Sequence, residues 1–285
     1  MQNVLSDDLN TQLKKTYNMN NYEVIYKSKK KGKCYIFFSG NGLYYPNERE
    51  VFEKVVLRDN RYEWMNVCQK SNFLFDKAVF VRDIYKQWYV TGINSRFNTI
   101  EKLLDFLKIE TEGYDVVTVG NSAGGYIAVI AGMVLKAQAV FSFSSQFNLW
   151  EMIEGNSFLE KYRDDVRSKY YGLNTLFKQN TEVPIFHFYP GNCDLDIRQS
   201  EYAKQINNVY FFKFNEKIHG NTVLAVNYQY IFNKSLDELK TLSERFSNRK
   251  INRFIFLFES AGICSGCISL YRYYVKKILD WRYGK

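Results

Sequence analysis

Residues 115–135, DVVTVGNSAGGYIAVIAGMVL, decide the fold class of this 285-residue chain. The first five are mostly β-branched and predict a buried strand, whereas residues 125–135 are small and apolar and predict a buried helix. Between them lies Gly120-Asn-Ser122-Ala-Gly124. A serine flanked by glycines in this way is typical of a tight strand-to-helix turn, because larger side chains at the glycine positions would clash.

Predicted strands and helices alternate along the rest of the chain. The expected strands cover residues 34–39, 77–82, 115–119, 137–143, 184–189 and 209–214, and the expected helices cover 98–108, 125–135 and 222–232. Such alternation predicts an α/β fold, in which a mostly parallel sheet is flanked by helices on both faces. A further strand at 22–26 is expected to join 34–39 through a hairpin turn at the lysine-rich residues 27–33.

We expect a single domain over residues 1–285 with two helical additions. Residues 148–180 are polar and charged, and they stand where a lid could be inserted between strands. Residues 235–285 follow the last predicted strand as a helical C-terminal appendage, whose end is apolar on most sides but carries basic residues. This end fits a buried docking helix or a dimer contact, and the alternative is a helix on a membrane surface. The oligomeric state stays open.

Composition excludes several classes of protein. Aromatic residues make up 18% of the chain, which is too many for a disordered protein. Five cysteines are sparse for a disulfide-stapled secreted module, and the odd number would leave one unpaired. Residues 116–135 are uncharged, but the glycines among them would break a membrane span, and the N-terminus lacks a signal-peptide pattern. We therefore expect a cytoplasmic protein, with peripheral contact to the inner membrane face through the C-terminal helices as a further hypothesis.

Charge and motifs bound the partners and cofactors. The formal net charge of +9 favours polyanionic partners, but no nucleic-acid-binding module follows the basic run, so we expect no nucleic-acid partner. The sequence contains no glycine-rich phosphate-binding motif, so no nucleotide cofactor is indicated. Cys264 and Cys267 form a C-x-x-C pair without a second pair or a nearby histidine, so the sequence predicts no metal site.

A catalytic serine needs a base and an acid that orients the base, and few residues qualify. Of the two histidines, His187 lies inside a predicted strand, where a structural role is expected. His219 lies in a loop between the last strand and a helix, where an imidazole can be reached, and is the candidate base. Asp194 and Asp196 follow the preceding strand and are the candidate acids.

The chain order of Ser122, an acid after the next-to-last strand and His219 after the last strand resembles that of the α/β-hydrolase superfamily. The resemblance covers about residues 33–235 and implies the α/β-hydrolase fold. The spacing Gly191-x-x-Asp194 resembles the acid-bearing loop of the superfamily and favours Asp194 over Asp196 as the third member of the triad.

The same resemblance implies an oxyanion hole built from two backbone N–H groups. One would be that of Ala123, the residue after the nucleophile. The other, by its position in Ser39-Gly-Asn-Gly42, would be that of Asn41. Ser39 stands where the superfamily often has histidine, so this part of the motif is a loose match, and an ordinary turn is the alternative for the two glycines.

Three segments narrow the resemblance further. The Gly120-Asn-Ser-Ala-Gly-Gly-Tyr126 elbow, the loop from Asp83 to Tyr89 and Phe141-Ser-Phe-Ser144 are similar to bacterial proteins associated with surface-polysaccharide synthesis. This likeness implies serine-dependent acyl transfer from an ester, by a carbohydrate O-acetyl esterase or an O-acetyltransferase. Acetyl-CoA is a candidate acyl donor for a transferase, and no other cofactor is expected. The alternative is a non-catalytic module that binds carbohydrate or a partner on the same scaffold.

Aromatic and arginine side chains in residues 148–180 are candidates for substrate binding. Trp150 can stack on a sugar ring, and Arg163 and Arg167 can form paired hydrogen bonds with carboxylates. Together with the net charge of +9, they predict an acidic polysaccharide as the substrate. The alternative is that these side chains pack the inserted segment onto the sheet.

Overall fold

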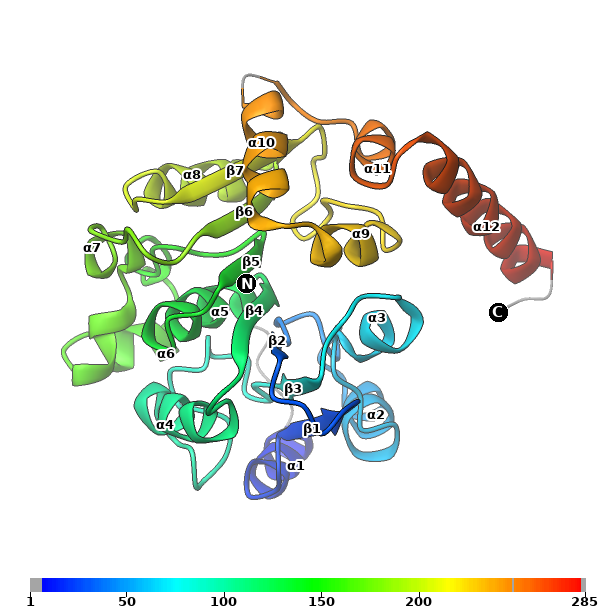
Figure 1. Ribbon diagram of the computed structural model, residues 1–285. Helices are drawn as coiled ribbons and strands as arrows, with labels where there is room; N and C mark the ends of the chain where they lie inside the picture. Colours follow the sequence, from blue (N-terminus) through cyan, green and yellow to red (C-terminus); the bar gives the residue numbers. More distant parts are fainter. Residues whose placement is uncertain (1–6, 248, 283–285) are drawn as a thin grey trace.

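The computed structural model describes residues 7–247 and 249–282 and contains a seven-stranded sheet (Figure 1). The spatial order of the strands is β1-β3-β2-β4-β5-β6-β7. All neighbouring strands are parallel except β1, which is antiparallel to β3. The strand bounds are β1 (Tyr22–Tyr26), β2 (Lys33–Phe38), β3 (Lys77–Val81), β4 (Asp115–Asn121), β5 (Ala139–Phe143), β6 (Ile185–Pro190) and β7 (Val209–Phe214). The predicted α/β class, with a mostly parallel sheet, is confirmed.

The hairpin predicted at residues 27–33 is wrong, because β3 lies between β1 and β2. The N–H groups of Lys27 and Ser28 both donate to the carbonyl oxygen of Asp76, the residue before β3. The carboxylate of Asp76 also accepts hydrogen bonds from the Ser28 hydroxyl and from the N–H of Lys33. Asp76 therefore holds both ends of the basic turn while the two strands that it joins stay apart.

Helices cover both faces of the sheet, and α4 and α5 lie on the opposite side from α3 and α9 (Figure 1). The twelve α-helices of the described residues are α1 (Asp7–Tyr17), α2 (Arg49–Phe52), α3 (Met65–Lys70), α4 (Ile100–Glu110), α5 (Ala123–Val134), α6 (Ser157–Lys161), α7 (Leu173–Leu176), α8 (Asp194–Ala203), α9 (Asn227–Asn233), α10 (Leu236–Phe246), α11 (Arg253–Ala261) and α12 (Ile263–Arg282). A π-helix, η1 (Glu53–Arg58), follows α2, and two 3-10 helices, η2 (Trp150–Met152) and η3 (Val166–Tyr170), lie in the segment 148–180.

Two large apolar cores sandwich the sheet because side chains alternate along each strand. In β2, Ile36 and Phe38 belong to the core beneath α4 and α5, whereas Tyr35 and Phe37 belong to the core beneath α3, α9 and α10. All four are at most 1% exposed. Because both faces are covered, the strands are almost wholly apolar, as expected of buried parallel strands.

The C-terminal helices extend from one end of this body, and α12 reaches away from it (Figure 1). Helix α12 packs against α11, and the hydroxyls of Tyr230 in α9 and Ser269 in α12 lie 2.8 Å apart. Ile268 and Tyr271 of α12 are 53% and 70% exposed. Among the described residues, no helix combines the length and the apolarity needed to span a membrane. The cytoplasmic location and the peripheral membrane contact stay predictions, and residues 248 and 283–285 of the appendage lie outside the described residues.

Candidate active site

Ser122 lies at the turn between β4 and α5, with φ 55° and ψ −122°. A positive φ is costly for a serine and is typical of functional sites, where the surrounding structure holds the strain in place. Two close backbone approaches impose the turn here. A Cβ atom at Gly120 would lie 2.0 Å from the Gly124 carbonyl oxygen, and one at Gly124 would lie 2.3 Å from that of Phe38. The glycines of the motif are therefore steric requirements of the turn.

His219 links Ser122 to a buried carboxylate. Its Nε2 lies 2.9 Å from Ser122 Oγ, and its Nδ1 lies 2.9 Å from Asp196 Oδ2. An ionised carboxylate only accepts hydrogen bonds, so Nδ1 donates to Asp196 and Nε2 is left to accept from the serine hydroxyl. This is the arrangement in which an imidazole can remove the serine proton.

The carboxylate that contacts His219 is that of Asp196, which corrects the preference for Asp194 based on loop spacing. Helix α8 begins at Asp194, so the two aspartates lie on a helix, about 200° apart around its axis. Asp196 is buried and faces His219, whereas Asp194 is exposed in the first turn. The Gly191-x-x-Asp194 spacing favours Asp194 only if the segment is an extended loop, whereas a helix from 194 to 203 favours Asp196.

Ser144 fixes the loop that carries His219. It follows β5 with φ 46°, and its hydroxyl accepts a hydrogen bond from the N–H of Gly220 at 3.1 Å. Gly220 has φ 79°, which glycine adopts without strain. No local pattern in the sequence indicates this role for Ser144, because only the fold brings the end of β5 to the loop that carries His219.

Both predicted oxyanion donors lie beside the turn. Ala123 is the first residue of α5, so its N–H has no partner within the helix. Gly40 and Asn41 follow β2, which lies between β3 and β4 in the sheet. The N–H of Gly40 donates to the carboxylate of Glu63, and the side chain of Asn41 donates to the carbonyl oxygen of Lys86. The N–H of Asn41 donates to no atom of the described residues and stays the predicted second donor.

His187 is completely buried in β6 and lies outside the Ser122–His219–Asp196 arrangement. Its Nδ1 lies 3.1 Å from the hydroxyl of Ser142, which in turn donates to the hydroxyl of Ser145. Burial lowers the pKa of His187 to about 4, against a smaller raising effect of Asp196. A neutral imidazole inside the sheet agrees with the structural role expected from the sequence.

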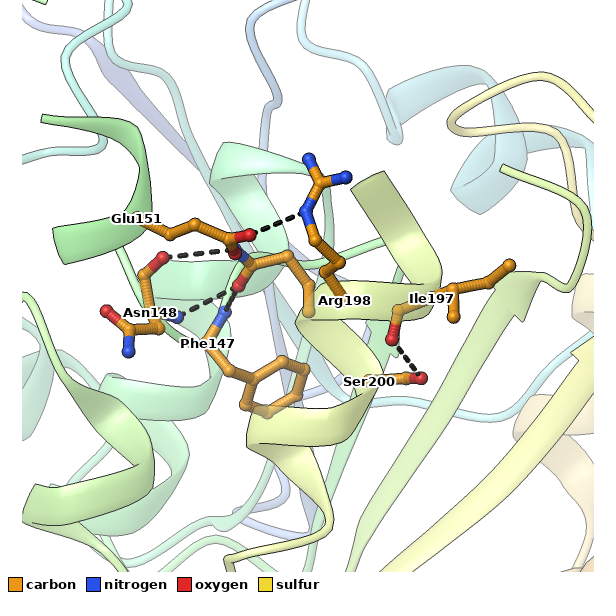
Figure 2. Close-up of polar contacts among 7 residues, drawn as sticks. Phe147, Asn148, Glu151, Ile197, Arg198 and Ser200 are labelled. Atoms are coloured by element: carbon orange, nitrogen blue, oxygen red, sulfur yellow. Dashed lines mark hydrogen bonds and ion pairs between the residues drawn. The ribbon is translucent and has the colours of Figure 1, made fainter. Parts of the chain in front are cut away.

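The segment 148–180 is attached to α8, the helix that carries Asp196 (Figure 2). Gln199 Oε1 accepts from the N–H groups of Phe147 and Asn148, and its Nε2 donates to the Asn148 carbonyl and to Glu151. Arg198 also contacts Glu151, through an ion pair at 2.5 Å. Gln199 is only 1% exposed and has all four of its hydrogen-bonding positions filled.

The three predicted substrate-binding residues of this segment differ in their exposure to solvent and in the contacts that they already make. Trp150 is 44% exposed, with its ring edge-on to Tyr171. Arg163 is exposed. The guanidinium of Arg167 is 3.3 Å from Asp165 and 4.6 Å from the ring centre of Tyr162, so it is already paired within the segment. Binding of substrate by these residues stays a prediction.

Comparisons with known proteins give likenesses in structure and none in sequence. No family model matches the sequence, and none of the curated proteins matches it. The chain is similar to the capsule O-acetyltransferase of Neisseria meningitidis serogroup A, at 14% identity over 80% of this chain and 92% of that one, with a TM-score of 0.51. It is also similar to a Staphylococcus aureus fluorophosphonate-binding serine hydrolase (10% identity, 80% and 92% of the chains, TM-score 0.48). A third neighbour is an alpha/beta hydrolase from a lagoon-sediment metagenome (15% identity, 81% and 96%, TM-score 0.42).

This protein has the α/β-hydrolase fold. Three features define the fold here: the mostly parallel sheet, the strained serine between β4 and α5, and the histidine after β7. The α/β-hydrolase fold that the sequence resemblance implies is thereby confirmed.

Proposed function

We propose that this protein catalyses serine-dependent acyl transfer from an ester, with Ser122 as nucleophile, His219 as general base and Asp196 as the acid that orients His219. The observation that carries the proposal is the pair of 2.9 Å contacts that His219 makes to Ser122 and Asp196. Reactive groups in hydrogen-bond reach, with the base oriented by a third group, are the signature of an activated nucleophile.

In the first half of the reaction, Ser122 Oγ attacks the ester carbonyl carbon while His219 Nε2 takes the hydroxyl proton. The C–O double-bond electrons move onto the carbonyl oxygen, and the N–H groups of Ala123 and Asn41 donate to the resulting oxyanion. The N-terminus of α5 adds its positive dipole end to the same charge. Collapse of the intermediate expels the alkoxide, which takes the proton from His219, and leaves Ser122 acylated.

In the second half, His219 removes a proton from the acceptor hydroxyl, whose oxygen attacks the acyl carbonyl carbon. Collapse of this second intermediate breaks the bond to Ser122 Oγ, which takes the proton back from His219. The acceptor is water in an esterase and a sugar hydroxyl in an O-acetyltransferase. We propose a carbohydrate acceptor, supported by the shared fold with a capsule O-acetyltransferase and by the likeness of the elbow to proteins of surface-polysaccharide synthesis. Acetyl-CoA stays the candidate donor for the transferase.

An acidic polysaccharide remains the proposed substrate because of the formal net charge of +9. Arg163 is the better candidate contact, since Arg167 already pairs with Asp165. Binding through Arg163 should weaken as salt rises through the physiological range.

The proposal is tested with p-nitrophenyl acetate, in the presence and absence of acidic or neutral oligosaccharides. An esterase releases nitrophenol and acetate in equal amounts, whereas a transferase gives less acetate than nitrophenol and an acetylated sugar detectable by mass spectrometry. Ser122→Ala should abolish both products. Acetyl-CoA replaces the nitrophenyl ester in a parallel arm. Turnover that survives in Ser122→Ala, or no turnover with any donor, would contradict the proposal.

A further inference from the structure

Glu63 lies next to both loops that build the candidate active site. It occupies the connection between η1 and α3, and each oxygen of its carboxylate accepts one hydrogen bond. Oε2 accepts from the N–H of Gly40 at 2.5 Å, and Oε1 accepts from the side-chain amide of Asn121 at 3.1 Å. Gly40 precedes the predicted oxyanion donor Asn41, and Asn121 precedes Ser122. One carboxylate therefore joins the donor loop to the nucleophile turn.

Further contacts hold Glu63 itself against the end of β2. Its own N–H donates to the hydroxyl of Ser39 at 3.2 Å, and the indole N–H of Trp64 donates to the carbonyl oxygen of Phe38 at 3.0 Å. The fit is tight, because a Cβ atom at Gly40 would lie 2.6 Å from the Asn121 carbonyl oxygen and 3.3 Å from Glu63 Oε2. The segment 63–64 thus fixes the backbone of residues 38–40 at the place where the chain enters the donor loop.

The two hydrogen bonds require Glu63 to act as an acceptor at both oxygens. Both partners are N–H donors, so a protonated carboxyl group would turn one oxygen into a donor that faces another donor. Burial raises the pKa of Glu63, and the hydrogen bonds from Gly40 and Asn121 together with the charge of Arg61 oppose this rise. Tyr89 and Tyr228 are the other titratable groups that feel the Glu63 charge.

We propose that Glu63 is a positioning residue, which sets the distance between the Asn41 N–H and Ser122 by bridging Gly40 and Asn121. It also occupies the Gly40 N–H, so the next N–H along the chain, that of Asn41, is the one left for an oxyanion. The inference rests on the proposed function, because an oxyanion hole matters only in acyl transfer. It adds a residue that lies outside the triad and outside the G-x-S-x-G motif.

The test compares Glu63→Gln with wild type, and with Glu110→Gln as the matched control. Glu110 is also a partly buried carboxylate, but it pairs with Lys77 where β3 begins, at the opposite end of the sheet. A glutamine at position 63 keeps the shape and one acceptor oxygen, and it places an N–H against one of the two donors. Because oxyanion donors act chiefly in the transition state, kcat for p-nitrophenyl acetate should fall roughly 10- to 100-fold, with KM within twofold of wild type.

Two further readouts separate positioning from a general loss of structure. A boronic acid adds to the serine as a tetrahedral adduct, so its inhibition constant should rise by about the same factor as kcat/KM falls. The pH profile of kcat/KM should show one more protonation step on the acid side in wild type than in Glu63→Gln, because only wild type carries a carboxylate at position 63. The unfolding midpoint, measured in parallel, shows whether each variant is folded. If Glu63→Gln fails to fold, Glu63→Asp replaces it, because aspartate keeps the charge but has a shorter side chain.

The outcomes are distinct for the two proposals. Wild-type kcat in Glu63→Gln, or a loss of kcat with unchanged boronate inhibition, overturns the role of Glu63 while acyl transfer by Ser122 stands. An equal loss in Glu110→Gln also overturns it. A wild-type protein that turns over no ester overturns both proposals. A kcat-selective loss confined to the Glu63 variants, matched by weaker boronate inhibition, supports the positioning role.

Discussion

Asp196 Oδ2 lies 2.9 Å from His219 Nδ1, and the two side chains differ sharply in exposure. The carboxylate-bearing side chain is 1% exposed, whereas the imidazole side chain is 32% exposed. The acid is therefore shielded from water while the base remains accessible to an acceptor. A shielded carboxylate beside a reachable imidazole suits the roles proposed for the two residues.

The geometry of α8 makes a prediction about two neighbouring aspartates. Asp196→Asn should lower kcat about three to four orders of magnitude, because the orienting carboxylate and its charge are lost. Asp194→Asn is the matched control and should change kcat less than threefold, since Asp194 is exposed and turned away from His219. Steady-state hydrolysis of p-nitrophenyl acetate measures both values of kcat. A larger loss in Asp194→Asn than in Asp196→Asn would show that Asp194 is the acid that orients His219.

The attachment of the segment 148–180 to α8 predicts a loss of stability in Gln199→Leu. The variant leaves the N–H groups of Phe147 and Asn148 without their acceptor. The cost is about 1 to 3 kcal/mol for the buried N–H of Phe147 and less for the partly buried N–H of Asn148. Arg198→Ala is the control, because its ion pair with Glu151 is half-exposed and should contribute less than about 1 kcal/mol. Urea unfolding compares them, and equal losses would mean that Gln199 does not anchor the segment.

The buried imidazole of His187 predicts an acid-sensitive contribution to stability. Its pKa is about 4 in the folded protein, below the ordinary value of about 6.5, so the unfolded chain binds the proton more readily. Its contribution is complete above about pH 6.5 and is lost as the pH falls towards 4, at up to about 1.4 kcal/mol per pH unit.

The measurement is the free energy of unfolding at pH 7.5 and pH 5.0 for wild type and His187→Gln. Asp83, whose pKa burial raises to about 6, acts in the opposite direction, but it is present in both proteins and cancels in their difference. Wild type should therefore lose about 2 kcal/mol more than the variant between the two pH values. Identical losses would show that His187 is not held neutral in the core.

The sequence was sufficient for the parts of the site that depend on local pattern. Ser122 could be predicted because the steric demands of the turn select glycine at 120 and 124, and His219 because it is one of only two histidines and lies in a loop. The strand order could not be predicted in full. Hydrogen bonds from residues 27, 28 and 33 to Asp76, which is distant in sequence, hold the turn after β1 next to the start of β3, and β3 lies between β1 and β2.

The other features that could not be predicted depend on contacts between segments that are distant in sequence and meet beside the ends of the strands. Two aspartates two positions apart are equivalent in a loop, and only the start of α8 at Asp194 separates them. Glu63 is 58 residues from Asn121 in sequence and carries no local motif, so its contact required the packed structure. Ser144 is distant from Gly220 in the same way.

Labelling with a fluorophosphonate probe tests most directly whether Ser122 is an activated nucleophile. We expect one phosphonyl adduct per chain, mapped by mass spectrometry to Ser122 and absent from Ser122→Ala. The adduct should form much more slowly in Asp196→Asn than in Asp194→Asn. Folded wild-type protein that stays unlabelled beside a labelled control hydrolase, or an adduct at another residue that persists in Ser122→Ala, would contradict this expectation.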